Sequence, residues 1–339
     1  MTKYTGFAAF DETGELREYS YDPGLLGPEQ VEIKVINCGL CHSDLSMARN
    51  DWAITEYPVI PGHEVIGEIS DLGETAKAKG LKKGQKVGLG WFSQSCTCCR
   101  SCLSGDQNLC AQAEMTIVGR HGGFADFVRA HWQWTIPLPD NIDLQSAGPL
   151  FCGGITVFNP IVISGVQPTD KVGVIGIGGL GHLALQFLNK WGCEVTAFSS
   201  SPDKADEARK FGAHHVVDSR DDSALEAEAS QYDFIISTVN VPLNWQAYMT
   251  ALKPKGKLHN VGAVPDPIPV SAFDLIMAER SVGGSSLGPP TTNHEMLDFC
   301  MRHDIRPDIE VFAMKDVNKA VDHLDKGRAR YRIVLENEA

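Results

Sequence analysis

Val172-Gly-Val-Ile-Gly-Ile-Gly-Gly-Leu-Gly-His182 lies halfway along the chain and decides the fold of the second half. The apolar run Val172–Ile175 predicts a buried strand, and apolar residues at helical spacing continue to Trp191. Glycines in G-x-G-x-x-G register between them permit a tight turn, whose backbone N–H groups can approach a pyrophosphate at a helix N-terminus. We therefore predict a dinucleotide-binding unit rather than an ordinary glycine-rich loop, with contacts from Gly176, Gly178, Gly179, Leu180 and Gly181.

From Asp170 onward, strand and helix patterns alternate. Strands are predicted at 171–175, 194–199, 215–218, 232–238, 255–262 and 281–286, and helices at 179–191, 203–211, 221–230 and 243–251. This alternation is typical of an α/β fold with a parallel, doubly wound sheet. The tail, Thr291–Ala339, contains helices and a last strand, Arg330–Leu335, and we expect it to pack back onto the first domain.

The first half of the chain is β-rich and irregular. Val31–Ile36, Lys86–Leu89 and Gly123–Arg129 resemble strands, and Asn37–Arg49 is expected to open as a helix from a polar cap. The length of 339 residues favours two domains. We place a first domain at 1–153 with 288–339, and the dinucleotide-binding domain at 154–287.

The composition is that of an acidic globular protein, with 43% hydrophobic residues and a net charge of -13. This charge opposes binding to nucleic acid or to an anionic membrane surface. We expect neither a secretory signal nor a membrane-spanning segment. The ten cysteines are therefore expected in a reducing, cytoplasmic compartment, where clustering indicates metal binding or catalysis.

Five cysteines lie within Gln94–Cys110, and Cys98 is the one outside a Cys-x2-Cys-x2-Cys-x7-Cys pattern. Four thiolates from one short loop can form the closed tetrahedral site of a structural Zn²⁺. A disulfide knot, reactive thiols or an iron–sulfur cluster remain alternatives, as do other pairings through Cys98. The preferred ligands are Cys96, Cys99, Cys102 and Cys110.

Cys41, His63 and Cys152 indicate a second metal site, although each alone is more often a packed core residue. Two sulfurs and one imidazole leave a fourth position for water or substrate. An open Zn²⁺ there can polarise a carbonyl oxygen, which suits hydride transfer from a nicotinamide.

Taken together, these motifs resemble the zinc-dependent medium-chain alcohol dehydrogenases. Within that superfamily they are similar to the cinnamyl-alcohol-dehydrogenase-like branch and its bacterial NADPH-dependent broad-specificity aldehyde reductases. The resemblance runs end to end, and it implies a GroES-like zinc-binding catalytic domain, a Rossmann domain and two Zn²⁺ ions per chain. Besides the glycine turn, it is carried by Cys41-His-Ser-Asp-Leu-Ser46, Pro61-Gly-His-Glu-Val-Ile-Gly67 and Ala147-Gly-Pro-Leu-Phe-Cys-Gly-Gly-Ile-Thr-Val-Phe158.

The resemblance also implies a role for each metal-site residue. Cys41, His63 and Cys152 fall on the catalytic zinc ligands. Glu64 falls on a carboxylate that coordinates zinc in some states of related enzymes, or that acts as an outer acid. Asp44 matches the acid that orients the zinc histidine.

The same helix is expected to serve the cofactor and the proton relay. Ser43 matches the hydroxyl that passes a proton between the substrate oxygen and the cofactor ribose, and His42 matches a pyrophosphate contact. Many family members continue the relay with a histidine where this chain has Ser46, so water is the alternative carrier. Thr156 falls near the nicotinamide, or packs within a helix.

NADP(H) is the expected cofactor because the second strand of the dinucleotide unit ends in Ser199 and Ser200 instead of a carboxylate. A carboxylate would repel a 2′-phosphate, whereas the hydroxyls can donate to it and Lys204 can supply charge. Asp203 is expected to cap the next helix and face away. A solvated serine turn with no cofactor preference is the alternative.

The implied reaction is reduction of a small-molecule aldehyde to a primary alcohol. Met115 and Ser286 stand where plant lignin enzymes carry bulky aromatics, which indicates a roomier apolar pocket. Trp52, Trp91 and Leu287 are candidate walls, or ordinary core.

Two rival functions stay open on the sequence. One is an alcohol or polyol dehydrogenase that works in the oxidative direction, and the other is a catalytically silent NADPH-binding protein on the same fold. The edge strand Val282–Leu287 could pair across a two-fold axis, as in homodimers of the family.

Overall fold

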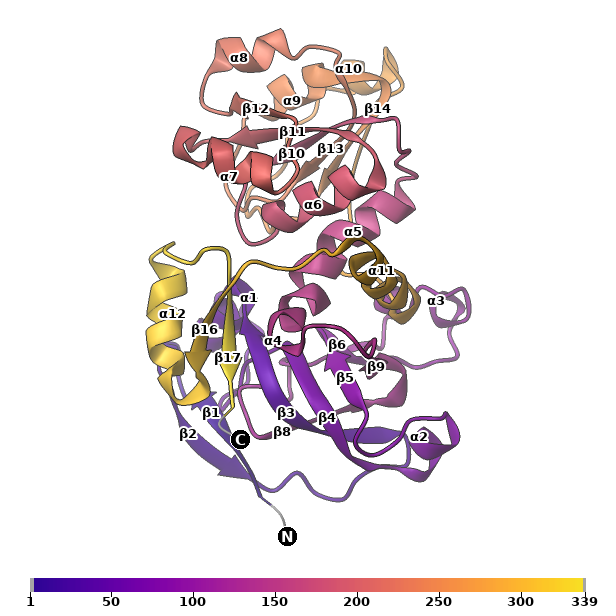
Figure 1. Ribbon diagram of the computed structural model, residues 1–339, viewed down its shortest axis with the longest axis vertical. Coiled ribbons are helices and arrows are strands. Elements are labelled where there is room, and N and C mark those ends of the chain that lie inside the picture. Colours follow the sequence, from indigo (N-terminus) through magenta and orange to yellow (C-terminus); the bar gives the residue numbers. More distant parts are fainter. Residues whose placement is uncertain (1–2, 338–339) are drawn as a thin grey trace. The chain divides into compact units, whose positions relative to one another are not determined.

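The computed structural model describes residues 3–337, whose contacts divide the chain into two compact units (Figure 1). The first unit extends to Ile155 and resumes at Leu287, and the second unit is Thr156–Ser286. The domain boundaries predicted from the sequence lie after residues 153 and 287.

The second unit is built on a six-stranded sheet in which every neighbouring pair is parallel. Its order, β12-β11-β10-β13-β14-β15, confirms the doubly wound fold. The chain adds strands outward to one side of β10 and then, from β13 onward, to the other side, and such sheets open a ligand crevice at this switch between β10 and β13. The strands are β10 (Lys171–Ile175), β11 (Glu194–Ser199), β12 (His215–Asp218), β13 (Tyr232–Ser237), β14 (Leu252–Asn260) and β15 (Ser281–Gly284).

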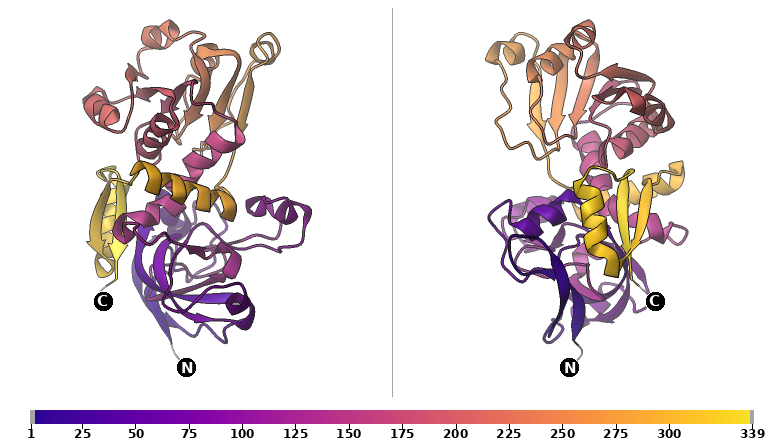
Figure 2. Two further views of the ribbon diagram at one scale, coloured as in Figure 1. Left: turned by 45° about the vertical axis from the view of Figure 1, so that its right-hand side comes forward. Right: turned by 90° about the vertical axis from the view of Figure 1, so that its left-hand side faces the viewer.

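Helices cover this sheet on both sides (Figures 1 and 2). Phe198, Ile235 and Leu258 of the strands pack with Trp245 and Tyr248 in one buried cluster. The helices are α6 (Gly181–Trp191), α7 (Ala205–Lys210), α8 (Asp222–Ala227), α9 (Trp245–Ala251) and α10 (Ala272–Ile276).

The expectation that Asp203 caps the next helix is wrong. Asp203 lies inside a 3₁₀ turn, Pro202–Lys204, and α7 starts after it with Lys204 as its N-cap residue. The extra turn forms because the Lys204 N–H donates to the Ser201 carbonyl at 3.0 Å, which delays the helix.

The first unit is organised around the long strand β3 (Gln30–Leu40) of a seven-stranded sheet. One half of β3 pairs antiparallel with β8, and the other half with the C-terminal strand β17. The remaining order is β16-β17-β3-β4-β5-β9. The strands are β4 (Glu64–Leu72), β5 (Lys86–Leu89), β8 (Phe127–His131), β9 (Ile136–Pro137), β16 (Ile309–Ala313) and β17 (Arg332–Glu336).

Shorter elements complete this unit. Two small sheets join β1 (Tyr4–Ala9) to β2 (Leu16–Tyr21), and β6 (Phe92–Gln94) to β7 (Glu114–Met115). The 3₁₀ segments are η1 (Gln107–Leu109), η2 (Trp132–Trp134), η3 (Gly148–Phe151) and η5 (Met314–Asp316). The helices are α1 (His42–Arg49), α2 (Glu74–Ala78), α3 (Arg100–Leu103), α4 (Leu144–Ala147), α11 (Pro290–His303), α12 (Val317–Asp325) and α5 (Gly153–Ile163), which runs on into the second unit.

Two local expectations for this half were wrong. Asn37 does not open a helix but lies buried within β3, because its backbone continues the ladder and its Nδ2 donates to the Leu144 carbonyl at 2.9 Å. The strand expected at Gly123–Arg129 is displaced to β8, because the backbone of 122–124 hydrogen-bonds to the turn Ile60–Gly62 instead.

The C-terminal tail packs onto the first unit, as expected from the sequence. β17 pairs in parallel with β16 and antiparallel with β3, and α12 lies beside these strands (Figure 1). The last described strand therefore lies inside the sheet, between the edge strand β16 and β3.

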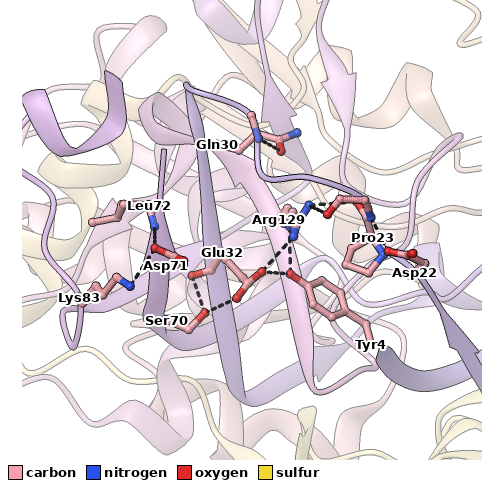
Figure 3. Close-up of polar contacts among 12 residues, drawn as sticks. Tyr4, Asp22, Pro23, Gln30, Glu32, Ser70, Asp71, Leu72, Lys83 and Arg129 are labelled. Carbon is pink, nitrogen blue, oxygen red and sulfur yellow. Dashed lines mark hydrogen bonds and ion pairs between the residues drawn. The ribbon is translucent and has the colours of Figure 1, made fainter. Parts of the chain in front are cut away.

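A polar clasp ties the N-terminal hairpin to this sheet (Figure 3). The Tyr4 hydroxyl and the Arg129 guanidinium both donate to the Glu32 carboxylate, which Ser70 also contacts at 2.9 Å. Arg129 reaches further to the carbonyl of Pro23 at 2.9 Å. Because these partners come from β1, β3, β4 and β8, the clasp fixes four strands at one point.

Within residues 3–337, no single helix is long and apolar enough to cross a membrane. One bent pair, Leu144–Phe151 with Gly153–Ile163, passes by length and composition, a test that buried core helices also pass.

Candidate metal centres and cofactor site

Four buried donors meet at one point of the first unit. Cys41 is the N-cap residue of α1, His63 and Glu64 stand where the turn enters β4, and Cys152 links η3 to α5. Their donor atoms all lie within 4.8 Å of one another, and the two sulfurs are 4.0 Å apart. The structure thus brings together residues that are far apart in the sequence.

Asp44 holds two of these donors in place. Its Oδ1 accepts from the Gly62 N–H and contacts His63 Nδ1, both at 2.8 Å, and its Oδ2 accepts from the Cys41 N–H at 2.9 Å. One carboxylate thereby fixes the start of α1 and the turn that carries His63. This is the contact with the histidine that the resemblance implies for Asp44.

The orientation of His63 fits a metal ligand. Asp44 Oδ1 lies against Nδ1, so in the neutral ring with its proton on Nδ1 the Nε2 nitrogen is the one that can bind a metal. Nε2 is fully buried and has no hydrogen-bond partner, and neither has Glu64 Oε2. Buried polar atoms are nearly always satisfied, so two such atoms beside two thiols suit a cation.

Arg332 is a residue that the sequence reasoning missed. It lies on β17, is 5% exposed, and its guanidinium forms an ion pair with Glu64 Oε1. Its signal was one charged residue in the otherwise apolar run Tyr331–Leu335. The pair offsets the charge of the buried carboxylate, and one Glu64 oxygen lies within 4.8 Å of the other donor atoms.

Proximity perturbs the ionisation of these groups. The hydrogen bond between the thiols lowers the pKa of Cys41 and raises the pKa of Cys152. Burial opposes a charged imidazole, but the Asp44 carboxylate outweighs it and raises the pKa of His63. Burial also raises the pKa of Glu64, against the pull of Arg332. Donors so mutually perturbed are typical of a site built for a cation.

The residues beside Cys41 on α1 are accessible. Ser43 is half-buried, and its hydroxyl contacts Cys41 Sγ at 3.8 Å. His42 is exposed at the first position of the helix, and Ser46 is half-buried one turn further on.

An aromatic pair flanks His63. The Trp91 ring meets the His63 ring edge-on at 5.0 Å, and Trp52 meets Trp91 edge-on at 5.9 Å. Trp52 is 39% exposed, so the pair extends from a ligand to solvent. Of the other predicted wall residues, Met115 and Leu287 pack partly buried against the core of the first unit, and Ser286 ends the second unit.

A separate lobe carries the second cysteine group. Figure 2 shows α3 on a loop that stands out from the sheet of the first unit. The sulfurs of its four expected ligands lie within 4.8 Å of one another, and Cys98 is outside this group and exposed. The grouped residues are Cys96, Cys99, Cys102 and Cys110.

Backbone donors and burial make the sulfurs of the lobe unequal. N–H groups of Cys98 and Cys99 lower the pKa of Cys96 to about 6, whereas burial raises the pKa of Cys102 to about 12. Contact with the Cys96 sulfur raises the pKa of Cys98. Four sulfurs at mutual contact, with no disulfide among them, form the donor set of a closed metal site.

The glycine turn has the geometry that a dinucleotide needs. Gly176 adopts a φ of +87°, and a Cβ on Gly181 would lie 1.8 Å from the Gly176 carbonyl oxygen. At Gly178, in contrast, an added Cβ would meet nothing within 4 Å, so this backbone is open to approach. The first helical residue of α6 is Gly181, and Gly179 and Leu180 precede it in the turn.

The three residues expected to recognise a 2′-phosphate behave differently. Lys204 Nζ donates to the Ile177 carbonyl at 3.4 Å, so its charge lies over the glycine turn. Ser200 is exposed, but Ser199 is buried and its hydroxyl donates to the Ser201 carbonyl at 3.2 Å. Thr156 lies on α5 and is buried.

Comparison with known proteins agrees with this arrangement. Residues 27–140 match the alcohol dehydrogenase GroES-like domain, and residues 179–302 match the zinc-binding dehydrogenase family. The chain is 52% identical to the aldehyde reductase AdhA of Synechocystis sp., with 98% of each chain covered. It is 38% identical to cinnamyl alcohol dehydrogenase 7 of Arabidopsis thaliana, which covers 98% of this chain and 95% of that protein.

Solved structures give the same result. The cinnamyl alcohol dehydrogenase SbCAD4 of Sorghum bicolor superposes with a TM-score of 0.93 at 36% identity, over 99% of this chain and 98% of that one. The structure of CAD from Helicobacter pylori complexed with NADP(H) superposes with a TM-score of 0.88 at 31% identity, with the same coverage.

Proposed function

The chain belongs to the zinc-binding alcohol dehydrogenase family, and we propose that it reduces aldehydes to primary alcohols with NADPH. The observation that supports this most directly is the buried group of Cys41, His63 and Cys152, with His63 Nε2 unpartnered among thiols. The aldehyde reductase activity named for the relative at 52% identity supports the same reaction.

The chain's own residues then divide the work. Cys41, His63 and Cys152, with Glu64 as an additional donor, would hold a Zn²⁺, which would supply Lewis-acid polarisation of the carbonyl. Asp44 fixes the tautomer and direction of His63, and Arg332 balances the charge of Glu64. The Ser43 hydroxyl beside Cys41 delivers a proton to the substrate oxygen.

A second metal, held by Cys96, Cys99, Cys102 and Cys110, has a structural role. Four sulfurs fill the four positions around a tetrahedral Zn²⁺, which leaves no open position for substrate. Such a site contributes folding energy and does no chemistry.

The NADPH preference rests on Lys204 and the serine turn. The Lys204 ammonium over the glycine turn attracts a phosphate, and the exposed Ser200 hydroxyl can donate to it. The buried Ser199 hydroxyl, bonded to Ser201, instead shapes the turn. The pyrophosphate contacts fall to the turn residues, and Thr156 flanks the nicotinamide.

The aromatic pair Trp52–Trp91 favours aldehydes with apolar substituents over polyols. Its rings run from the ligand His63 to solvent and offer stacking and apolar area, but few hydrogen bonds to hydroxyl groups. A broad substrate range is expected from such a wall, since apolar surfaces discriminate shape weakly.

The test is NADPH oxidation with short aliphatic, long aliphatic and aromatic aldehydes, before and after metal removal. We expect turnover with most of the panel, its loss on chelation and its return with Zn²⁺. Zinc-loaded protein without turnover would identify a silent NADPH-binding protein, and faster turnover with polyols and NADP⁺ would identify the oxidative alternative. Equal kcat/KM for NADH and NADPH would contradict the assignment of Lys204.

A homodimer is the assembly that the second unit favours. β15 pairs with β14 on one side and ends the sheet, and Phe273, Ile276 and Met277 beside it are more than 70% exposed. An open edge with adjacent apolar area suits pairing with a second copy, which sedimentation velocity would detect. A cytoplasmic location stays a prediction from the free cysteines.

A further inference from the structure

His182 is a buried histidine of the second unit, directly after the last glycine of the turn. It lies on α6 and is 0% exposed, and the residues that follow it, Leu183, Ala184 and Leu185, are buried and apolar. Burial of an imidazole costs free energy unless its polar atoms are hydrogen-bonded. The contacts of this ring therefore indicate what it does.

The ring contacts the carbonyl of the open glycine of the turn. His182 Nδ1 lies 3.1 Å from the Gly178 carbonyl oxygen, and the His182 backbone N–H donates to the same oxygen, also at 3.1 Å. A carbonyl oxygen only accepts, so the ring contact is a hydrogen bond when the ring proton is on Nδ1. One residue can thereby offer two donors to one carbonyl, whose oxygen has two lone pairs.

Aromatic packing holds the ring in this direction. The Phe211 ring meets the His182 ring edge-on, with the two centroids 5.3 Å apart and the planes at 67°. Phe211 is the C-cap residue of α7, the helix whose N-cap residue is Lys204. The imidazole is therefore held between α6 and the end of α7.

The direction of this carbonyl decides the direction of the next N–H group. The peptide bond between Gly178 and Gly179 is trans, and in a trans peptide the C=O and the N–H point in opposite directions. Because the Gly178 oxygen is directed along α6, the Gly179 N–H points out of the N-terminal end of the helix. Gly178 is exposed, and a Cβ there would meet nothing within 4 Å, so a phosphate can approach from this side.

We propose that His182 is a positioning residue for the cofactor: its imidazole holds the Gly178 carbonyl toward α6 and thereby keeps the Gly179 N–H directed at the pyrophosphate. The inference rests on the proposed function in one respect, which is that NADPH binds at the glycine turn. It deepens that proposal because it names a buried side chain that acts on the cofactor through the backbone.

A pre-set peptide matters here because two adjacent glycines restrict rotation very little. Without side chains on Gly178 and Gly179, the peptide between them can turn with little steric hindrance. Ordering it only when the cofactor binds would lower the affinity, whereas the contact with His182 restrains it beforehand. Loss of this contact is therefore expected to weaken NADPH binding and to leave the chemistry of the bound complex nearly unchanged.

Three substitutions of His182 separate the hydrogen bond from the packing of the ring. Asparagine places its Nδ2 donor where histidine has Nδ1, so His182→Asn keeps the contact. His182→Leu fills similar space without a donor, and His182→Gln carries its donor one atom further along the side chain. The matched control is Asn189→Leu, which removes a side-chain donor of the same helix from another glycine carbonyl, that of Gly212 at 2.9 Å.

The experiment measures the dissociation constant of NADPH by fluorescence titration of the zinc-loaded full-length protein. Adenosine 2′-monophosphate, which lacks the pyrophosphate, is measured alongside by competition with NADPH. Steady-state kinetics at saturating aldehyde give the KM for NADPH and the kcat. Circular dichroism and thermal melting show whether each variant is folded.

We expect His182→Leu and His182→Gln to bind NADPH about three- to tenfold more weakly than the wild type, which is the effect of one hydrogen bond. The KM for NADPH should rise while kcat changes by less than about twofold, since the lost interaction lies in cofactor binding. The affinity for adenosine 2′-monophosphate should stay unchanged. His182→Asn and Asn189→Leu should match the wild type in every measurement.

Wild-type affinity for NADPH in both His182→Leu and His182→Gln would overturn the proposal. An equal loss for NADPH and adenosine 2′-monophosphate would overturn it as well, because it would indicate damage to the whole unit. If His182→Leu does not fold, the comparison of His182→Asn with His182→Gln decides, and equal affinities of these two variants would overturn the proposal. A wild type that binds NADPH but reduces no aldehyde would contradict the proposed function and leave the binding comparison intact, whereas a wild type without affinity for NADPH would overturn both.

Discussion

The two cysteine groups of the first unit differ in what holds their donors in position. The donors of the group proposed to be catalytic come from the start of β4 and from the starts of α1 and α5, and are fixed by Asp44, Arg332 and a buried sheet. The donors of the lobe lie within fifteen residues of one another and contact mainly one another's sulfurs. The fold therefore organises the first group before any metal arrives, whereas the metal must organise much of the second.

The largest effect should come from removing a catalytic donor. We expect Cys41→Ala to lower kcat/KM by at least about 10³-fold, because Lewis-acid polarisation is worth several kcal/mol. The dissociation constant for NADPH, measured by fluorescence titration, should stay nearly unchanged, since the glycine turn belongs to the second unit. If Cys41→Ala retained turnover, the group that contains Cys41 would not be catalytic, and its proposed difference in role from the lobe cysteines would be lost.

A smaller effect on activity is expected when the proposed ligand His63 is kept and the residue that positions it, Asp44, is changed. Asp44→Asn keeps the shape of the side chain but loses the charge that fixes the His63 tautomer. Changes to such supporting residues typically cost about 10–100-fold in metal affinity or activity. Zinc affinity from chelator competition and steady-state kinetics would measure it, with Ser46→Ala as a control on the same helix. An unaltered zinc affinity would mean that the fold does not organise this site through Asp44.

The smallest effect on turnover should come from the lobe. Cys102→Ser removes one donor of the closed set, and we expect one zinc ion fewer per chain and faster proteolysis within 95–113. The kcat/KM at room temperature should change by less than about threefold, because the two donor groups are distinct. A loss of turnover as large as that of Cys41→Ala would show that the groups are coupled.

The same contrast explains what could be predicted from the sequence. The sulfur group of the lobe could be predicted from the spacing of its cysteines, because they are close together in the sequence. Cys41, His63 and Cys152 carry no such local signal, and their grouping depended on a family resemblance. The alternating second half was predictable from periodicity, and the strand order confirmed its doubly wound sheet.

Misses occurred where tertiary contacts override local pattern. Asn37 has the composition of a helix cap, but a ladder on both sides draws it into β3. Asp203 looks like a cap as well, yet the preceding turn moves the helix start past it. Arg332 could not be paired with Glu64 from the sequence, because 268 residues separate them and only the sheet brings them together.

The 268 residues between Glu64 and Arg332 set the order in which the two cysteine groups can form during synthesis. The lobe has all four sulfurs once Cys110 has emerged, so a nascent chain can load its zinc early. The Glu64 carboxylate gains its counter-charge only after Arg332 of β17, 268 residues further along the chain, has been synthesised. A chain cut short before Arg332 would keep the lobe but bury an uncompensated acid beside its catalytic thiols. The burial of Glu64 therefore depends on a strand that is synthesised long after the lobe.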